Sequence, residues 1–190
     1  MSVTLRAVFL RGAVAVLALW LAACTAAPEQ AGFQQAARLA DAGLGEGERL
    51  RIVASTSIAG DVVAQVGGDL IELQVLIQPG QDPHSYEPAA RDIARLEDAH
   101  VIFVNGLGLE ENLIEMLQGT GTGVPVVALA EDIEPLAAEH DGEEDDDHGD
   151  LDPHVWLNPL HVVTWTGTIA DTLSTLDPAH ADTYAANAAA

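Results

Sequence analysis

The sequence predicts an α/β fold in which a parallel four-stranded sheet is flanked by helices. Four short apolar segments alternate along the chain with segments whose apolar residues recur at helical spacing. Because consecutive parallel strands need a crossover connection, this alternation favours a parallel sheet over a run of hairpins. In addition, two identical Asp-Pro-His tripeptides each follow a predicted strand region, where open parallel sheets place their ligand sites.

The first half of the fold is predicted to contain two strands and two helices. We expect strands at Leu50–Ala54 and Leu70–Ile77, joined by a helix at Ile58–Val66 whose apolar side chains share one face. The second strand leads into a loop. A helix follows the loop, and Ile93 and Leu96 mark its buried face.

The second half of the chain continues the alternation. The strand Val101–Val104 is apolar at every position, which is typical of a strand buried on both faces. A helix around Leu113–Leu117 and a strand at Val124–Leu129 follow it. Two further helices are expected at Val162–Leu176 and Pro178–Ala190.

The first residues have the pattern of a lipoprotein signal peptide. Arg6 and Arg11 lie at the start of an apolar run that is shorter than the roughly 20 residues needed to cross a bilayer. The run ends at Cys24, the only cysteine, which cannot form an intramolecular disulfide but lies where a lipid would be attached. We expect removal of residues 1–23, lipidation of Cys24 and a flexible tether at residues 24–48. An ordinary secretion signal or a weak membrane anchor is the alternative.

The charge of the chain excludes nucleic acid as a partner. Loss of Arg6 and Arg11 with the signal peptide reduces the 7 basic residues to 5 against 30 acidic ones, so the formal net charge becomes −25. Such a surface repels phosphates and favours cations. The acidic side chains are densest at residues 131–151, where we expect a loop because no packed core could absorb them.

The candidate metal ligands are His84 and His154, the histidines of the two Asp-Pro-His tripeptides. A proline restricts its own φ and holds the preceding residue extended, so each imidazole is presented from stiff backbone. Neutral imidazole binds zinc well, and manganese when carboxylates complete the coordination shell. A single histidine can instead cap a turn or bond locally, but the shared context of these two favours a metal site.

Three segments resemble the solute-binding lipoproteins of bacterial zinc and manganese ABC transporters. They are residues 79–88, 103–110 and 152–157, which occur in the expected order and with compatible spacing. The resemblance implies two α/β lobes joined by one long helix, with the metal held between them by two ligands from each lobe. It assigns His84 and His154 to the amino-terminal lobe. The other two ligands, usually a histidine and an acidic residue, would belong to a lobe absent from this chain.

The same resemblance implies the domain boundaries. Residues 49–176 would form the amino-terminal lobe, and residues 177–190 would begin the connecting helix, which is truncated here. The chain departs from the family pattern at Asn112, where tryptophan is frequent, and at Asn158, where aspartate is common. Neither position is expected to bind metal.

The acidic loop at residues 131–151 bears on the choice of metal. Zinc-type members of the family carry a loop rich in histidine and acidic residues at this point, so the resemblance favours Zn²⁺, with Mn²⁺ as the alternative. Tyr86 and Glu87 are expected to hold the histidine loop without touching the metal. The loop is either a solvated segment without a role or a weak accessory cation site, whose candidate ligands are His140, Glu143, Glu144, Asp145, Asp146, Asp147 and His148.

The implied function is that of an extracytoplasmic, lipid-anchored binding component of an ABC importer for zinc. Its expected partners are a metal ion and a membrane permease, and the protein is expected to be a monomer. A metal-binding adhesin or buffer is one alternative. A metallohydrolase is another, because Asp82 and Asp152 could support a metal-activated water. No catalytic acid or base stands out, however, so we do not expect an enzyme.

Overall fold

The computed structural model describes residues 39–120, 123–136 and 151–190 of the chain. All described residues belong to one compact unit, Gln35–Ala190, which contains the whole sheet.

Four strands form one parallel sheet, as the alternation of apolar segments predicted. They are β1 (Leu50–Thr56), β2 (Ile71–Ile77), β3 (Val101–Val104) and β4 (Val126–Ala128), in the spatial order β2-β1-β3-β4. The chain adds β2 on one side of β1 and then β3 on the other. The carboxyl ends of β1 and β3 therefore flank a topological switch point, the usual ligand position in such sheets.

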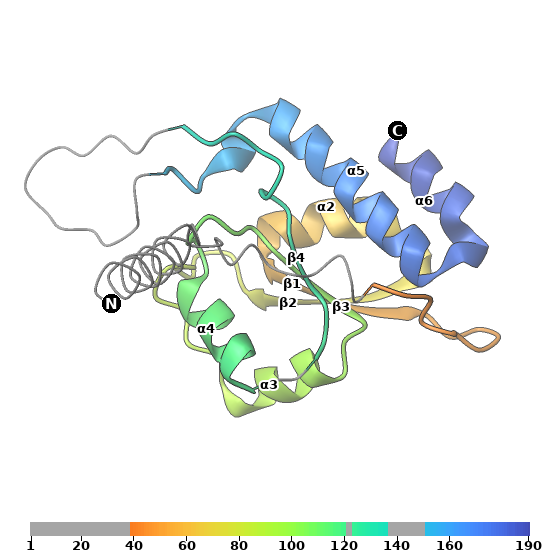
Figure 1. Ribbon diagram of the computed structural model, residues 1–190, viewed down its shortest axis with the longest axis horizontal. Coiled ribbons are helices and arrows are strands. Elements are labelled where there is room, and N and C mark those ends of the chain that lie inside the picture. The colour runs from red at the N-terminus through yellow and green to blue at the C-terminus, as the bar shows by residue number, and fades with distance from the viewer. Residues whose placement is uncertain (1–38, 121–122, 137–150) are drawn as a thin grey trace, which may run out of the picture. The chain divides into compact units, whose positions relative to one another are not determined.

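Helices cover both faces of the sheet (Figure 1). On one face lie α2 (Ser57–Gly67), α5 (Pro159–Leu176) and α6 (Ala181–Ala188), which contact one another. On the other lie α3 (Ala90–Glu97) and α4 (Glu111–Thr120). In the part of the chain that the structure describes, short 3₁₀ turns occur at Gly68–Leu70, Val155–Leu157 and Pro178–His180. The fold class predicted from the sequence is thus confirmed.

An apolar core cluster lies between the sheet and the helices α2, α5 and α6. Alternate strand residues such as Ile52 and Phe103 belong to it, together with the fully buried rings of Trp165 and Tyr184. Because successive strand residues point to opposite faces, the intervening buried residues, such as Ile102, face α3 and α4. Burial on both faces explains why β3 is apolar throughout.

Side-chain caps determine where two of the helices begin. The Thr56 hydroxyl accepts a hydrogen bond from the Ala59 amide (3.2 Å) at the start of α2. The Asn158 side chain accepts one from the Leu160 amide (3.0 Å), and Pro159 occupies the first position of α5. Helix α5 therefore begins three residues before the predicted Val162, because capping and not apolar spacing sets its first residue.

The last part of the predicted tether packs on the fold. Leu39, Ala42 and Leu44 lie against the apolar cluster, and the Ala42 amide donates to the Leu176 carbonyl (2.8 Å). The segment was predicted to be a flexible tether because its composition is largely polar and small. Its two leucines nevertheless pack against the core. Residues 24–38 and the lipidation candidate Cys24 lie outside the described residues.

No helix in the described part of the chain is long and apolar enough to span a membrane.

Candidate metal site

The first candidate ligand, His84, lies in the loop between β2 and α3, which we call the His84 loop (residues 78–89). A turn opens the loop, in which the Gln78 amide donates to the Gln81 side-chain oxygen (2.7 Å). The Asp82 carboxylate then accepts hydrogen bonds from the Ser85 hydroxyl (2.7 Å) and the His84 amide (3.1 Å). The Ser85 bond, followed by the His84 amide, lowers the pKa of Asp82. The ionised Asp82 thus holds the backbone of His84 and leaves its imidazole to other contacts.

The second candidate ligand, His154, is held by its own tripeptide. One oxygen of Asp152 accepts hydrogen bonds from the His154 amide (2.9 Å) and from the imidazole Nδ1 (2.7 Å). These two bonds, the backbone one first, lower the pKa of Asp152. Because an ionised carboxylate only accepts, Nδ1 carries the proton and Nε2 carries the lone pair. This is the usual preparation of a metal-binding histidine, in which an outer carboxylate fixes tautomer and ring orientation.

The fold brings the two imidazoles together although the histidines are 70 residues apart in the sequence. Their ring centroids lie 5.7 Å apart with an interplanar angle of 60°. Two imidazoles bound to one tetrahedral zinc at about 2.1 Å have centroids about 5 Å apart, so the observed centroid separation is close to that of a pair that shares one ion. The Trp156 ring contacts His154 edge-on, with centroids 5.2 Å apart.

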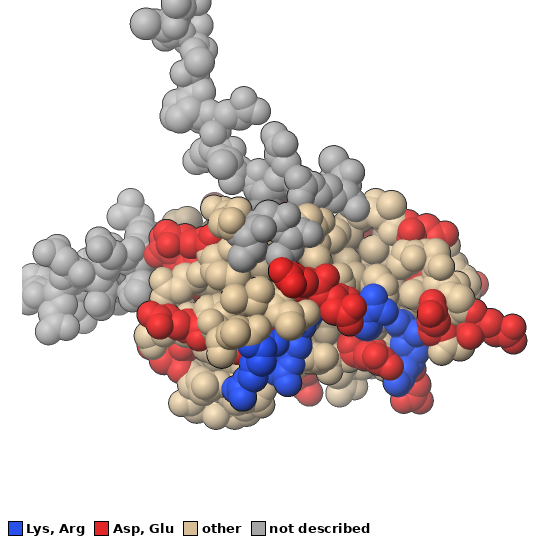
Figure 2. All heavy atoms as spheres, turned by 90° about the horizontal axis from the view of Figure 1, so that it is seen from below, with Lys and Arg blue, Asp and Glu red and all other residues tan. Residues whose placement is uncertain are grey.

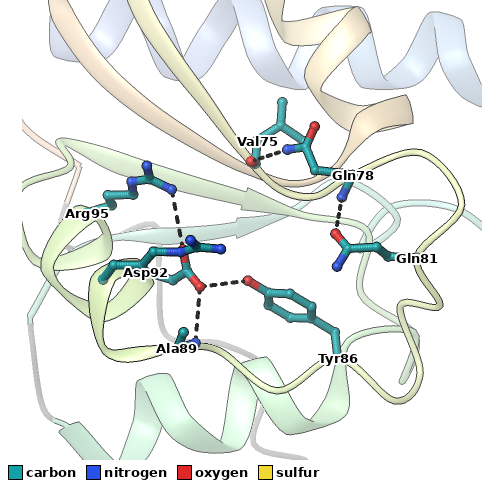
Figure 3. A network of polar contacts seen from close by, with 8 residues as sticks. Val75, Gln78, Gln81, Tyr86, Ala89, Asp92 and Arg95 are labelled. Carbon is teal, nitrogen blue, oxygen red and sulfur yellow. Dashed lines mark hydrogen bonds and ion pairs between the residues drawn. The ribbon is translucent and has the colours of Figure 1, made fainter.

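Tyr86 anchors the end of the His84 loop to α3. Its hydroxyl donates to a carboxylate oxygen of Asp92 (3.2 Å), which also accepts from the Ala89 amide (3.0 Å), and Figure 3 shows the ring aimed at that carboxylate. Asp92 is buried and forms an ion pair with Arg95 (3.3 Å). Burial, and then the Asp92 charge, raises the pKa of Tyr86. Glu87 is exposed and borders a hollow of about 340 Å³ in front of these groups.

A buried carboxylate organises the backbone at the carboxyl end of β3. Glu110 is 1% exposed and accepts hydrogen bonds from the Ser55 hydroxyl (2.5 Å), the Asn105 amide (2.9 Å) and the Gly106 amide (3.1 Å). Burial raises the pKa of Glu110, and these three donors oppose the rise. The Asn105 side chain in turn donates to the carbonyl of Pro153 (3.0 Å), the residue before His154.

Asn112, one of the two departures from the family pattern, also touches the site. Its side-chain amide donates to the His84 carbonyl at 3.3 Å. No contact at the site was predicted from the sequence for Asn105, Glu110 or Asn112. The sequence signal that could have indicated them is the change from apolar to polar residues at the carboxyl end of β3. This change lies in residues 103–110, one of the segments that resemble the metal-binding lipoproteins.

Three other histidines make local contacts away from this pair. The His100 Nδ1 accepts from the Arg51 amide (2.8 Å), and burial lowers the pKa of His100. The His161 Nδ1 lies 3.0 Å from the Val155 carbonyl, and the His180 Nδ1 lies 2.7 Å from Asp177. These contacts tie neighbouring elements together.

Among the described residues, no third candidate ligand accompanies the two histidines. Within residues 39–120, 123–136 and 151–190, no group of three or more histidine, cysteine or acidic side chains is arranged to hold a metal ion. The candidate accessory ligands of the acidic loop lie outside the described residues.

The arginines of the described part of the chain are paired with acids. Arg49 contacts Glu72 (2.7 Å), Arg51 contacts Asp98 (3.0 Å), and both Arg91 and Arg95 contact Asp92. Figure 2 shows the basic side chains in two groups, each bordered by acidic ones. The surplus of carboxylates therefore makes the net charge of the surface negative, and a negative surface attracts cations.

Two sequence relatives are named as binding lipoproteins. The manganese-binding lipoprotein MntA of Halalkalibacterium halodurans is 40% identical over 146 residues, which are 76% of this chain and 46% of that protein. The iron ABC transporter substrate-binding lipoprotein MtsA of Streptococcus pyogenes is 33% identical over 147 residues, with coverages of 74% and 46%. The chain thus spans about half the length of these curated relatives.

Solved structures share the fold. The manganese-bound periplasmic metal binding protein of Candidatus Liberibacter asiaticus matches with a TM-score of 0.65 and 28% identity over 74% of this chain and 51% of that chain. Zn(II)-bound AdcA of Streptococcus pneumoniae matches with a TM-score of 0.64 and 29% identity over 75% and 29%. Residues 52–190 match the family ZnuA, described as zinc-uptake complex component A, periplasmic. The resemblance seen in the sequence is thereby confirmed, and the chain belongs to the ZnuA family.

Proposed function

We propose that this chain is the amino-terminal, metal-binding lobe of the extracytoplasmic solute-binding component of an ABC importer. The observation that carries the proposal is the pair His84 and His154, whose rings lie 5.7 Å apart at one edge of the sheet. In this proposal each imidazole offers one nitrogen to the same ion. The ion is cargo, which a membrane permease would receive.

The remaining ligands would come from a second lobe. A closed zinc site has four ligands, and the described residues bring together two histidines. The chain spans 46% of the length of its curated relatives, which leaves room in a longer protein for such a lobe. Residues 177–190 would then begin the connecting helix, with Tyr184 packed in the core and bonded to Asp177 (2.9 Å).

Zinc is the proposed cargo. Two imidazoles are nitrogen donors, which suit zinc better than manganese, and the acidic tract resembles the loop of zinc-type family members. The family description also names zinc uptake. Manganese is the second candidate, because a 40% identical relative is named as a manganese-binding lipoprotein.

A transport role accounts for the carboxylates of the site better than hydrolysis does. Asp82 is bonded to Ser85 and to the His84 amide, and Asp152 is bonded to His154. Both therefore hold the histidines in place and are not aimed at a metal-bound water. A metal-binding adhesin or buffer would use the same site, and an adjacent gene pair encoding a permease and an ATPase would distinguish import from these roles.

The extracytoplasmic location follows from the amino-terminal pattern. Residues 1–23 would direct export, and a lipid on Cys24 would provide the only membrane contact. Metabolic labelling with a radioactive or clickable fatty acid tests this directly. Labelling of the natural protein and its loss in Cys24→Ala are expected, whereas equal labelling of both would exclude Cys24 as the lipid site.

Calorimetric titration with Zn²⁺ and Mn²⁺ tests the metal assignment. We expect the full-length protein to bind one Zn²⁺ tightly, with Zn²⁺ displacing Mn²⁺, and His84→Ala and His154→Ala each to abolish tight binding. His100→Ala is the matched control, because its imidazole bonds to Arg51 outside the site. Unchanged binding in both site variants would refute the proposed site, and tighter binding of Mn²⁺ than of Zn²⁺ would refute the proposed cargo.

A further inference from the structure

The segment between β3 and α4 adopts a backbone that needs support. We call this segment, together with the first two residues of α4, the β3–α4 corner (residues 105–112). Three consecutive residues have positive φ values: Gly106 (87°), Leu107 (55°) and Gly108 (79°). Glycine tolerates this conformation, but a leucine there is strained. The Glu110 carboxylate, which binds the amides of Asn105 and Gly106, holds the corner in this form.

An asparagine at each end of the corner binds the backbone of one histidine segment. The Asn105 side chain donates to the Pro153 carbonyl (3.0 Å), directly before His154. The Asn112 side chain donates to the carbonyl of His84 itself (3.3 Å). The corner is therefore connected to both histidine segments, which are separated by most of the lobe in sequence.

The orientation of the Asn105 amide is determined by its neighbours. Its nitrogen faces two carbonyl oxygens, those of Gly106 (2.9 Å) and Pro153 (3.0 Å). Carbonyls only accept, so the NH₂ group must point to them. Asn105 is fully buried, and the Pro153 carbonyl also accepts from the Val155 amide (2.8 Å). The Asn105 amide is thus a second donor to this carbonyl and links the β3–α4 corner to the segment that carries His154.

We propose that the β3–α4 corner is a spacer that sets the separation of the two imidazoles, with Asn105 and Asn112 as positioning residues. Neither asparagine is proposed to touch the metal. The inference rests on the proposed function of the His84 and His154 pair. Its physical reason is that metal ions require ligand nitrogens within a few tenths of an ångström of fixed distances, and two loops on separate connections do not hold such a separation by themselves.

Variants of the full-length protein test the spacer. Asn112→Leu keeps the volume and removes the donor, and Asn112→Gln restores an amide. Asn105→Ala removes the buried bridge. The matched control is Asn187→Ala, because the Asn187 amide also donates to a distant backbone carbonyl, that of Val66 (2.9 Å), but joins α6 to α2. Zn²⁺ affinity is measured by chelator competition, and the visible absorption of bound Co²⁺ reports the coordination geometry.

We expect Asn105→Ala to weaken Zn²⁺ binding about 10-fold and Asn112→Leu about 3-fold, with an altered Co²⁺ spectrum in both. Asn112→Gln should recover the affinity and spectrum of the natural protein. Asn187→Ala should lower the unfolding temperature and leave Zn²⁺ affinity and the Co²⁺ spectrum unchanged. Asn112 is exposed, so Asn112→Leu remains informative even if Asn105→Ala does not fold.

Two outcomes separate this inference from the function on which it rests. If His84→Ala and His154→Ala abolish binding while the folded Asn105 and Asn112 variants keep natural affinity and spectrum, the spacer is refuted and the proposed function stands. If the histidine variants also bind normally, both are refuted. An equal loss of affinity in Asn187→Ala would likewise refute the spacer. The loss would then result from a lower stability of the fold and not from a change in the separation of the imidazoles.

Discussion

The hydroxyl of Ser55 donates to the buried carboxylate of Glu110 at 2.5 Å, across 55 residues of sequence. This bond joins the carboxyl end of β1 to the turn after β3. These two strands flank the switch point of the sheet, and Asn105, which follows β3, reaches from there to the segment that carries His154.

Replacement of Glu110 should destabilise the fold. In Glu110→Gln an NH₂ group replaces one of the oxygens that accept backbone amides, so a buried N–H would face another donor. We expect the free energy of unfolding to fall by about 1–3 kcal/mol in urea denaturation. The neighbouring exposed Glu111→Gln is the control and should change it by less than about 0.5 kcal/mol. Equal effects of the two substitutions would contradict the role of Glu110.

The outer carboxylates of the two tripeptides should differ in their effect on metal affinity. Asp152 holds the imidazole of His154, whereas Asp82 holds the backbone of His84 and the Ser85 hydroxyl. We expect Asp152→Ala to weaken Zn²⁺ binding about 10-fold and Asp82→Ala to weaken it less. Calorimetry on both variants checks the order. A larger loss for Asp82→Ala would show that the conformation of the His84 loop matters more than the tautomer of His154.

Tyr86 and Tyr184 make the same kind of hydrogen bond in different parts of the fold, so their substitutions can be compared. Each donates to an aspartate, Asp92 or Asp177, but only Tyr86 lies in the His84 loop. We expect Tyr86→Phe and Tyr184→Phe each to lower the free energy of unfolding by about 1 kcal/mol. Only Tyr86→Phe should also weaken Zn²⁺ binding, by about 3-fold, because it releases the loop. If both leave the affinity unchanged, Tyr86 serves the fold alone.

Stability should depend on pH through His100. Burial, and secondarily the Arg51 charge, lowers the pKa of this imidazole in the folded state. The unfolded chain therefore takes up the proton first, so the contribution of His100 to stability is complete above about pH 6.5 and is lost as the pH falls below it. Urea midpoints between pH 5 and 8 should show a smaller decrease for His100→Asn, whose side-chain oxygen can still accept from Arg51. Parallel curves would contradict the prediction.

The cap of α5 should tolerate the residue that is common in the family. The Asn158 side-chain oxygen accepts a hydrogen bond from the Leu160 amide, and an aspartate oxygen can do the same. Asn158→Ala should lower the free energy of unfolding by about 1 kcal/mol, and Asn158→Asp should retain the stability of the natural protein in thermal denaturation. A loss in Asn158→Asp equal to that in Asn158→Ala would show that the amide nitrogen, which lies near His161, matters more than the cap.

The segments predicted most accurately are those defined by a pattern of neighbouring residues. The strand Val101–Val104 has the predicted bounds, because an apolar run between polar turns suffices to define a buried strand. The packing of Leu39, Ala42 and Leu44 was not predicted. Ala42 bonds to Leu176, which is more than 100 residues away, and no local pattern records such a contact.

In the candidate site, too, some residues were predictable from a local pattern and others were not. Proline beside histidine, repeated after two strand regions, was enough to select His84 and His154 from seven histidines. The roles of Asn105, Glu110 and Asn112 could not be assigned in this way. Polar residues after a strand are common, and their hydrogen-bond partners become definable only when the loops are placed.

The sequence by itself determined the class of fold, the acidic charge and the two histidines, because periodicity, composition and short motifs act through neighbouring residues. Only the tertiary structure decided that the two rings lie 5.7 Å apart, that a buried Glu110 supports the β3–α4 corner and that two asparagines connect this corner to both histidine segments. The physical reason is that a buried polar group must find its partner wherever the packed chain provides one, and strand order rather than sequence distance determines which partners are near.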